Sequence, residues 1–126
     1  MLDSHIAIAI AEKDLSRYGA AIEQAMLSPR IDKIVSVASL WEIAIKYRLG
    51  KLTFSLPLED WPDYFKALGF QLLPIDQHHA IEDLDIQPAT RDPFDRLLLA
   101  QCQVEGLRLV TIDRVLSGHP LVWQIA

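Results

Sequence analysis

The sequence predicts an α/β fold in which helices cover both faces of a mostly parallel sheet. Short apolar runs rich in Val, Ile and Leu alternate along the chain with longer segments whose apolar residues recur at helical spacing. This alternation is typical of right-handed strand–helix–strand crossovers, which place a parallel sheet between helices. The 126 residues, 51% of them hydrophobic, suffice for one core, so we expect a single domain over residues 1–126.

Local signals place the elements in order. Pro74 halts a strand, and Pro93 begins a helix because the first helical turn does not need its missing N–H. Gly50, Gly69 and Gly106 end helices, since glycine readily adopts the left-handed conformation found there. The predicted strands are residues 1–3 (a stub), 33–37, 70–73, 107–111 and 121–124. The predicted helices are residues 16–27, 39–49, 59–68, 76–84 and 93–105, with one helical turn at 113–117.

Composition excludes several classes of protein. No apolar run approaches the roughly 18–20 residues that span a bilayer, and no basic leader is present, so we expect neither a membrane protein nor a signal peptide. The single cysteine, Cys102, cannot form an internal disulfide, which favours the reducing cytoplasm. The histidines match no zinc-binding spacing. The net charge of −5 argues against binding nucleic acid by bulk electrostatics, although an acidic site that recruits cations would add negative charge.

Acidic residues follow the predicted strands, where ligands bind in parallel α/β sheets. Asp3 ends the first strand, Asp113 follows the fourth, and Glu42 is in the first turn of the helix after the second. Asp95 begins the helix before the fourth strand, so topology alone does not bring it to the same edge. Carboxylates are preferred ligands of Mg²⁺ and Mn²⁺, which polarise a phosphodiester and stabilise its leaving oxygen. Without metal, mutual repulsion should raise some of their pKa values.

Most of these acids also have a structural interpretation. Asp3 and Asp113 could cap the segments that follow them. Asp92, Pro93 and Asp95 have the pattern of a capped helix N-terminus. The two interpretations are compatible, because a helix N-terminus favours an ionised carboxylate.

Glu42 is the exception, because its neighbours are apolar on nearly every side of the predicted helix. An unpaired carboxylate is costly to bury, so its presence in this segment favours a functional role. The structural alternative is an exposed ion pair with Lys46, one turn later.

Four segments together resemble the PIN domain family, and most closely its VapC-like ribonuclease toxins. They are LDSH at residues 2–5, VSVASLWEIAIK at 35–46, RDPFDRLLLAQ at 91–101 and LVTID at 109–113. The resemblance covers essentially the whole chain, and SLWEIAIK followed by RDPFDRLLLAQ is its most specific part. It implies a three-layer α/β/α sandwich and a Mg²⁺- or Mn²⁺-dependent ribonuclease that cuts RNA as the toxin of a toxin–antitoxin pair.

The resemblance also implies residue roles and partners. The residues that match the family's catalytic, metal-binding acids are Asp3, Glu42, Asp95 and Asp113. Asp92, which precedes the usual position, is a candidate accessory ligand. The implied partners are an antitoxin, whose tail enters the acidic groove, and a second copy of the chain in a homodimer.

Four further residues are candidates for substrate binding. Ser36 and Ser39, six and three residues before the glutamate, match hydroxyls of the family, and one of them is expected to position water or phosphate. Arg96 and Arg114 each follow a predicted acid and are the basic residues best placed to contact RNA phosphates. A solvated surface position is the alternative for either arginine.

Two other functions remain open on the sequence. A PIN scaffold that has lost catalysis would be a binding module for protein or RNA, and only Met1 and Leu2 precede Asp3, fewer than the family's first strand carries. A receiver-like phosphoacceptor would need paired acids after the first strand and a lysine at the end of a late strand. This sequence has neither feature. The sequence also lacks a Gly-rich phosphate loop and the Gly-x-Ser-x-Gly turn of serine hydrolases.

Overall fold

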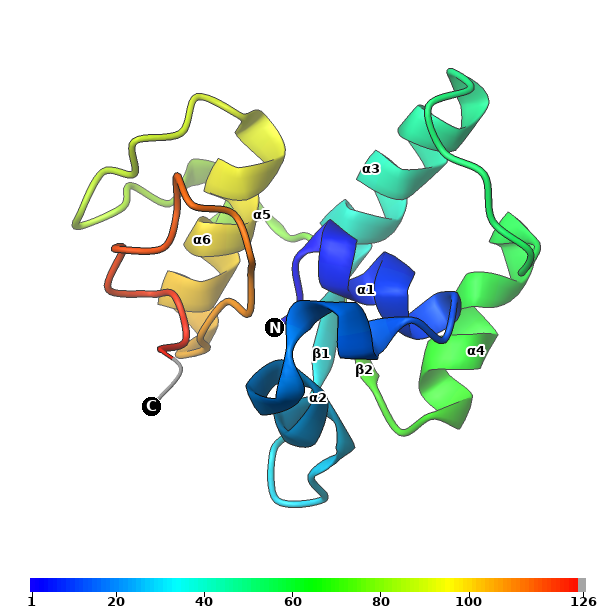
Figure 1. Cartoon of the computed structure of the whole chain (residues 1–126). Coiled ribbons are helices and arrows are strands. Elements are labelled where there is room, and N and C mark those ends of the chain that lie inside the picture. The colour runs from blue at the N-terminus through cyan, green and yellow to red at the C-terminus, as the bar shows by residue number, and fades with distance from the viewer. Residues whose placement is uncertain (125–126) are drawn as a thin grey trace.

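The computed structural model describes residues 1–124 as short strands surrounded by helices (Figure 1). The strands are β1 (Ile34–Ser36) and β2 (Gln71–Leu73). The α-helices are α1 (Ser4–Ala11), α2 (Ala20–Leu27), α3 (Val37–Arg48), α4 (Trp61–Ala67), α5 (Gln77–Ile81) and α6 (Pro93–Glu105). Two 3₁₀ turns, η1 (Leu15–Tyr18) and η2 (Leu58–Asp60), precede α2 and α4. The chain therefore has the mixed α/β character that the sequence predicts.

The sheet is smaller than the five strands predicted. β1 and β2 pair in parallel along their whole lengths. Three other segments join through single parallel bridges, which are Leu2 with Val35, Leu2 with Val110, and Leu109 with Val122. The order across the molecule is therefore β2, β1, Leu2, residues 109–110 and Val122, all parallel. The predicted strands at the start and end of the chain are reduced to these bridges.

The first predicted strand is short because the helix cap begins immediately after it. Leu2 N–H donates to Ile34 O at 2.9 Å, and Asp3 N–H donates to Val110 O at 3.0 Å. The Asp3 side chain already caps α1, so Leu2 alone forms bridges to both neighbouring segments. The segments thus have the order of a longer parallel sheet, but the central strand is reduced to the single residue Leu2.

Alternate residues of the strand segments belong to two buried clusters. Leu2 and Val35 pack with residues of α1, α2 and α4, whereas Ile34 and Leu109 pack with residues of α6. Successive side chains of a strand point to opposite faces, so helices cover both faces of the strands. Figure 1 shows α4 and α6 on opposite sides of β1 and β2.

Predicted helix boundaries were right where the capping residues are strong. α6 has the predicted bounds, with Asp92 as its N-cap and Gly106 in the left-handed conformation (φ 69°) at its end. The predicted helix at 16–27 is wrong in its middle, because Gly19 with φ 96° separates η1 from α2. The predicted helix at 59–68 begins instead as the 3₁₀ turn η2 and continues as α4.

Two further helices have shifted ends. α3 begins two residues earlier than predicted, because the Ser36 side chain accepts from the Ala38 N–H and caps it. α5 is shorter than predicted and ends at Ile81, since Glu82 is extended. Neither change moves the helix out of its place in the chain order.

α1 was not predicted. Residues 6–10 alternate Ile and Ala, and a period of two does not indicate an amphipathic helix. The helix is nevertheless buried around most of its circumference, with Ile6 and Ala7 fully inaccessible. The small alanines let neighbouring segments approach it, which an alternating pattern does not reveal.

The remaining expectations from composition concern membranes and disulfides. Among the helices of residues 1–124, none has the length and apolar character to cross a membrane. Cys102 is a buried free thiol, and its burial raises the thiol pKa to about 11. The predicted absence of an internal disulfide follows from its being the single cysteine.

Candidate active site

Asp3 lies between the bridge at Leu2 and the start of α1. Its Oδ1 accepts from the Ile6 N–H at 3.1 Å, so the predicted capping role is confirmed. Its Oδ2 accepts from the Thr111 hydroxyl. The residue is only 5% exposed, and burial raises the pKa of its carboxyl although these hydrogen bonds oppose the rise.

Thr111 joins Asp3 to Asp113. Its hydroxyl donates to Asp3 Oδ2 and accepts from the Asp113 N–H at 3.0 Å. Asp113 Oδ1 accepts from the Val115 N–H at 3.0 Å, so this acid also caps the turn that follows. That segment forms a turn at 114–118 instead of the predicted helical turn.

Glu42 extends from α3 to the beginning of α1. Its Oε1 accepts from the Ser4 hydroxyl, and its Oε2 lies 3.1 Å from Lys46 Nζ. The residue is 7% exposed, so it is buried as its apolar surroundings suggest, and it also forms the ion pair proposed as the alternative. Because Ser4 follows Asp3 directly, this hydrogen bond places Glu42 beside the Asp3 end of α1.

Asp95 lies in the first turn of α6, where its Oδ2 accepts from the Thr90 hydroxyl at 3.1 Å. The pKa of its carboxyl is raised to about 6. Burial is the main cause, and charge repulsion adds to it from Asp92, Asp113 and Glu42. The contact of Phe94 with Trp41 places this turn of α6 beside the turn of α3 that carries Glu42, a position that topology alone left open.

Helices α3 and α6 approach each other near their acids. The rings of Trp41 and Phe94, the residues just before Glu42 and Asp95, meet edge to face with centroids 5.5 Å apart. Together with the hydrogen bonds of Ser4 and Thr111, this contact ties the four segments into one group. The predicted acids that the fold brings together are Asp3, Glu42, Asp95 and Asp113.

A comparison with family models identifies the fold. The PIN domain model matches residues 1–119. The chain belongs to the PIN domain family. No curated protein matches it. Membership implies an α/β/α sandwich and places the chain in a family of metal-dependent nucleases that typically bind divalent ions.

The carboxylates of this PIN domain fit a hard divalent cation. Their donors are all oxygens, which Mg²⁺ and Mn²⁺ prefer. Burial raises the pKa values of Asp3 and Asp95, and a bound cation would oppose that rise by stabilising the ionised carboxylates. Within residues 1–124, no three of the four predicted acids bring ligand oxygens within 4.8 Å of one another. As these side chains lie, one ion could therefore bind directly to at most two of the four acids.

Asp92 is exposed at the start of the same helix as Asp95. Its Oδ1 accepts from the Phe94 N–H at 2.8 Å and from the Asp95 N–H at 3.3 Å, which confirms the predicted N-cap. Its charge is one cause of the raised pKa of Asp95, so it lies close enough to influence the group of acids.

Three hydroxyl residues that the sequence pattern does not single out support the acids. Ser4, Thr90 and Thr111 donate to Glu42, Asp95 and Asp3, in that order. The sequence positions of two of them could have indicated this role, because Ser4 follows Asp3 and Thr111 is two residues before Asp113. Which acid each hydroxyl contacts depends on the fold and not on sequence spacing.

The two serines predicted to bind substrate are both buried. Ser36 Oγ accepts from the Ala38 N–H at 3.0 Å and donates to Gln101 Oε1. Gln101 Nε2 in turn donates to Pro74 O at 3.3 Å. Ser36 therefore joins α3, α6 and the end of β2, and its hydroxyl is buried where a substrate does not reach it. Ser39 Oγ is buried without a hydrogen bond to any residue in 1–124.

For the two arginines, Arg96 and Arg114, contact with RNA phosphates stays a prediction. Arg96 Nη2 donates to Gln87 Oε1 at 2.6 Å, and Arg114 is exposed on the following turn. Among the ion pairs formed within residues 1–124, only that of Lys46 involves one of the four predicted acids. Lys46, and neither arginine, is thus the basic side chain in contact with the group.

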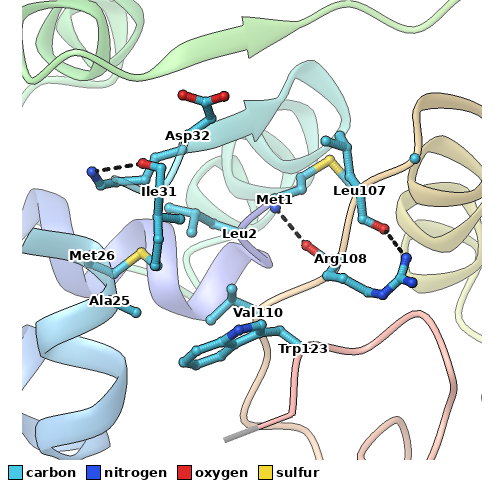
Figure 2. A pocket seen from close by; sticks show the side chains of 12 residues that line it. Met1, Leu2, Ala25, Met26, Ile31, Asp32, Leu107, Arg108, Val110 and Trp123 are labelled. Atoms are coloured by element: carbon cyan, nitrogen blue, oxygen red, sulfur yellow. Dashed lines mark hydrogen bonds between the residues drawn. The ribbon is translucent and has the colours of Figure 1, made fainter. Parts of the chain in front are cut away.

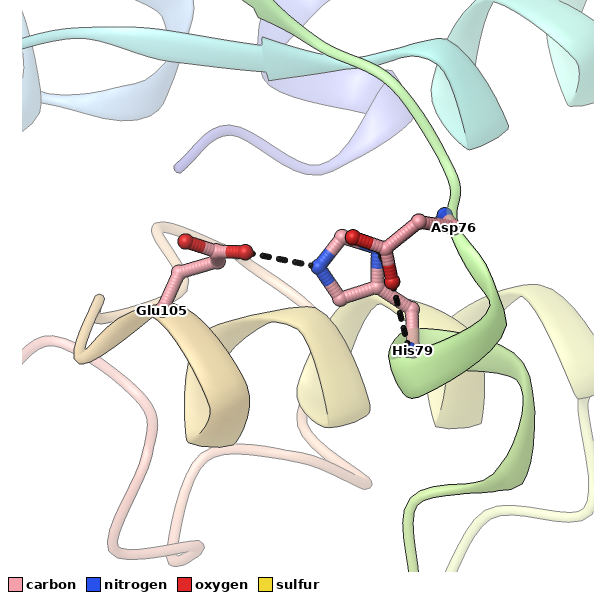
Figure 3. A group of neighbouring side chains, drawn as sticks. All are labelled: Asp76, His79 and Glu105. Carbon is pink, nitrogen blue, oxygen red and sulfur yellow. Dashed lines mark hydrogen bonds and ion pairs between the residues drawn. The ribbon is translucent and has the colours of Figure 1, made fainter.

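A second group of ligand-type atoms lies between α5 and the far end of α6 (Figure 3). It consists of Asp76, His79 and Glu105, whose ligand atoms lie within 4.8 Å of one another. His79 Nδ1 accepts from the Asp76 N–H at 3.1 Å, and Nε2 lies 2.9 Å from Glu105 Oε1. The ring is therefore the Nε2–H tautomer that donates to Glu105. Both ring nitrogens have protein partners, so the group is a helix cap that joins α5 to α6.

A pocket of about 200 Å³ opens beside Met1 and contains none of the predicted site residues (Figure 2). Its lining is largely apolar and includes Leu2, Met26 and Trp123. The α-ammonium of Met1 donates to Arg108 O at 2.7 Å, and burial lowers its pKa. The pocket lies at the amino ends of the strand segments, opposite the edge that carries the carboxylates.

Proposed function

We propose that this PIN domain is a Mg²⁺- or Mn²⁺-dependent endoribonuclease that hydrolyses RNA phosphodiesters. The observation that carries the proposal is the convergence of four carboxylates at the carboxyl edge of parallel strand segments. Two of them, Asp3 and Asp95, have raised pKa values. A divalent cation would offset both the burial and the repulsion that raise them. Acids in this arrangement suit phosphodiester hydrolysis.

In this proposal a hydroxyl orients each of three carboxylates. Thr111 holds Asp3, Ser4 holds Glu42 and Thr90 holds Asp95, each through one carboxylate oxygen. The remaining lone pairs are then available to cations. When bound, the ions would polarise the phosphodiester and stabilise its leaving oxygen.

Asp113 and Asp92 complete the set of proposed ligands. Two hydrogen bonds fix Asp113. Its backbone N–H donates to the Thr111 hydroxyl, and its Oδ1 accepts from the Val115 N–H. Asp92 Oδ1 accepts from backbone N–H groups at the start of α6, so Oδ2 is the atom proposed to bind an ion as an accessory ligand. Ser39 is buried three residues before Glu42, its hydroxyl has no hydrogen-bond partner among residues 1–124, and it is the remaining candidate to position water.

We further propose that the enzyme is the toxin of a toxin–antitoxin pair in the cytoplasm. The resemblance of SLWEIAIK and RDPFDRLLLAQ to VapC-like toxins supports this role. An antitoxin would inhibit by bringing a basic residue, such as arginine, to the acids. The proposal also includes a homodimer of single-domain chains with a three-layer α/β/α sandwich.

RNA cleavage by the purified protein tests the enzymatic proposal. Single-stranded and structured RNA are incubated with Mn²⁺, with Mg²⁺ and with a chelator. Asp95→Asn should abolish metal-dependent cleavage, because it removes one ligand while the amide oxygen still accepts from Thr90. Asp63→Asn is the matched control, since Asp63 is the third residue of α4 as Asp95 is the third residue of α6.

The two variants separate catalysis from folding. Both lose a negative charge near a helix N-terminus, and each change removes about 0.3–1 kcal/mol of favourable interaction with its helix. Activity lost equally in both would contradict the assignment of Asp95. A folded wild-type protein that binds no Mn²⁺ in calorimetry would favour the alternative function, a PIN scaffold without catalysis that binds protein or RNA.

A further inference from the structure

Lys46 lies one helical turn after Glu42 on α3 and contacts its carboxylate. The distance from Nζ to Glu42 Oε2 is 3.1 Å. The other oxygen, Oε1, accepts from the Ser4 hydroxyl. One oxygen of this buried acid is therefore held by a neutral donor, and the other by a cation.

The exposure of the two partners is very unequal. The Glu42 side chain is 9% exposed, whereas the Lys46 side chain is 40% exposed. The carboxylate is thus fixed within the protein, while the ammonium is at the end of a flexible four-carbon chain that reaches solvent. Lys46 can leave Glu42 by rotating its own bonds, with no movement of α3.

A lysine ammonium and a divalent ion compete for the same oxygen. Two cations that share Glu42 Oε2 would lie within a few ångströms of each other, and their repulsion opposes joint binding. The proposed function requires Glu42 to bind the ion, so Lys46 must then find another anion. The anion that arrives at such a site with the substrate is a phosphate of the RNA backbone.

We propose that Lys46 occupies the cation position at Glu42 in the metal-free protein and moves to a phosphate oxygen of RNA once a divalent ion binds. This inference rests on the proposed nuclease function, because it needs both the ion and the phosphate. Lys46 thereby weakens binding of metal without RNA and strengthens binding of RNA to the metal-loaded protein. Substitution of this one residue should change the two affinities in opposite directions.

The metal half is tested by titration of the full chain with Mn²⁺, with free Mn²⁺ measured by electron paramagnetic resonance. Lys46→Met keeps most of the side-chain stem and removes the charge. We expect it to bind Mn²⁺ roughly five- to tenfold more tightly than wild type, because a competing cation has gone. Lys66→Met is the control, since Lys66 is an exposed lysine in the last turn of α4. Its Mn²⁺ affinity should equal that of wild type.

The phosphate half is tested by fluorescence anisotropy with a short labelled single-stranded RNA of mixed sequence, with Ca²⁺ in place of Mg²⁺ to limit cleavage. Binding of the Lys46→Met protein should be weaker. The slope of log Kd against log salt should also fall by about 0.7, the value for one phosphate contact on a single strand. Lys66→Met should leave the slope unchanged.

Each outcome decides one part of the proposal. An Mn²⁺ affinity of Lys46→Met that is unchanged or weaker overturns the competition at Glu42. A salt slope equal to that of wild type overturns the contact with phosphate. Wild type that binds Mn²⁺ but cuts no RNA overturns the nuclease function, yet the Mn²⁺ titration still decides the competition. Wild type that binds no Mn²⁺ overturns both.

Discussion

The four carboxylates at the strand edge and the Asp76–His79–Glu105 group both gather ligand-type side chains, but they differ in how their hydrogen bonds are satisfied. In the second group each ring nitrogen of His79 has a protein partner, and Asp76 accepts from backbone N–H groups. At the strand edge Asp3 and Asp113 also accept from backbone N–H groups, but within residues 1–124 the Asp95 side chain accepts only from the Thr90 hydroxyl and is repelled by neighbouring acids. The group with the shorter spacing is therefore the one with less need of a metal.

The pKa directions give the same contrast. Backbone hydrogen bonds lower the pKa of Asp76, whereas burial raises the pKa of Asp3 and, with neighbouring charges, that of Asp95. A lowered pKa marks a carboxylate whose charge the protein already stabilises. A raised pKa marks one that an added cation would stabilise. Proximity of ligand atoms alone does not distinguish these cases.

Among the changes that test this comparison, the largest expected effect comes from Thr111, which supports two acids. Thr111→Val keeps the shape of the side chain but removes the hydroxyl that joins Asp3 to Asp113. Loss of such a supporting contact typically lowers metal affinity or activity by about 10- to 100-fold. We expect this loss in Mn²⁺-dependent RNA cleavage, with Thr111→Ser close to wild type. Equal activity of the Val and Ser variants would remove Thr111 from the site.

A change in the second group should affect stability without affecting metal binding. His79→Ala removes a buried ring with two hydrogen bonds, and it should lower the free energy of unfolding by about 2 kcal/mol. Unfolding in urea with and without Mn²⁺ measures both properties. At about 100 times its Kd, Mn²⁺ should stabilise wild type and His79→Ala alike by about 2.7 kcal/mol. A variant no longer stabilised by Mn²⁺ would make this group the metal site.

The smallest expected effect is a pH-dependent gain in stability for Asp95→Asn without metal. The folded-state pKa of Asp95 is about 6, above the ordinary 3.8, so its ionised form destabilises the folded protein. This cost is fully present above pH 6 and disappears as the pH falls towards 3.8. Asparagine does not ionise, so the gain of the variant should be full above pH 6 and fade as the pH falls towards 3.8. The side chain is only partly buried, and screening by solvent limits the gain to below about 1 kcal/mol.

Urea unfolding in chelator across this pH range measures the difference. Asp63→Asn corrects for the lost interaction with a helix N-terminus, because it changes the same residue type at the same place in α4. A stability difference between Asp95→Asn and Asp63→Asn that grows on acidification would contradict the assigned pKa.

The parts of the fold that sequence predicted well depend on local signals. α6 was predicted with correct bounds because Asp92, Pro93 and Gly106 are strong signals at its two ends. α1 was missed because burial of its alternating Ile and Ala side chains depends on packing by distant segments. The outer strands were predicted too long, since a bridge such as Leu109–Val122 depends on the place of its partner and not on its own residues.

The candidate site divides in the same way. The acids at strand ends follow from topology, and the resemblance to PIN domains added Asp95. The partners of these acids could not be predicted, because contacts such as Ser4–Glu42 join residues 38 positions apart. The sequence predicts an exposed ion pair between Lys46 and Glu42 only as a structural alternative, and it does not show that the glutamate is buried while the lysine stays exposed.

The hydrogen bond between Thr111 and Asp3 spans 108 positions of the sequence. Closing so long a loop has an entropic cost, and contacts of this separation form slowly in folding. A nascent chain or proteolytic fragment that stops before residue 111 has neither this hydroxyl nor Asp113, whatever the state of its helices. The full group of acids is thus among the last features to assemble during synthesis, so an activity that depends on it would begin only after residue 113 has been made and folded.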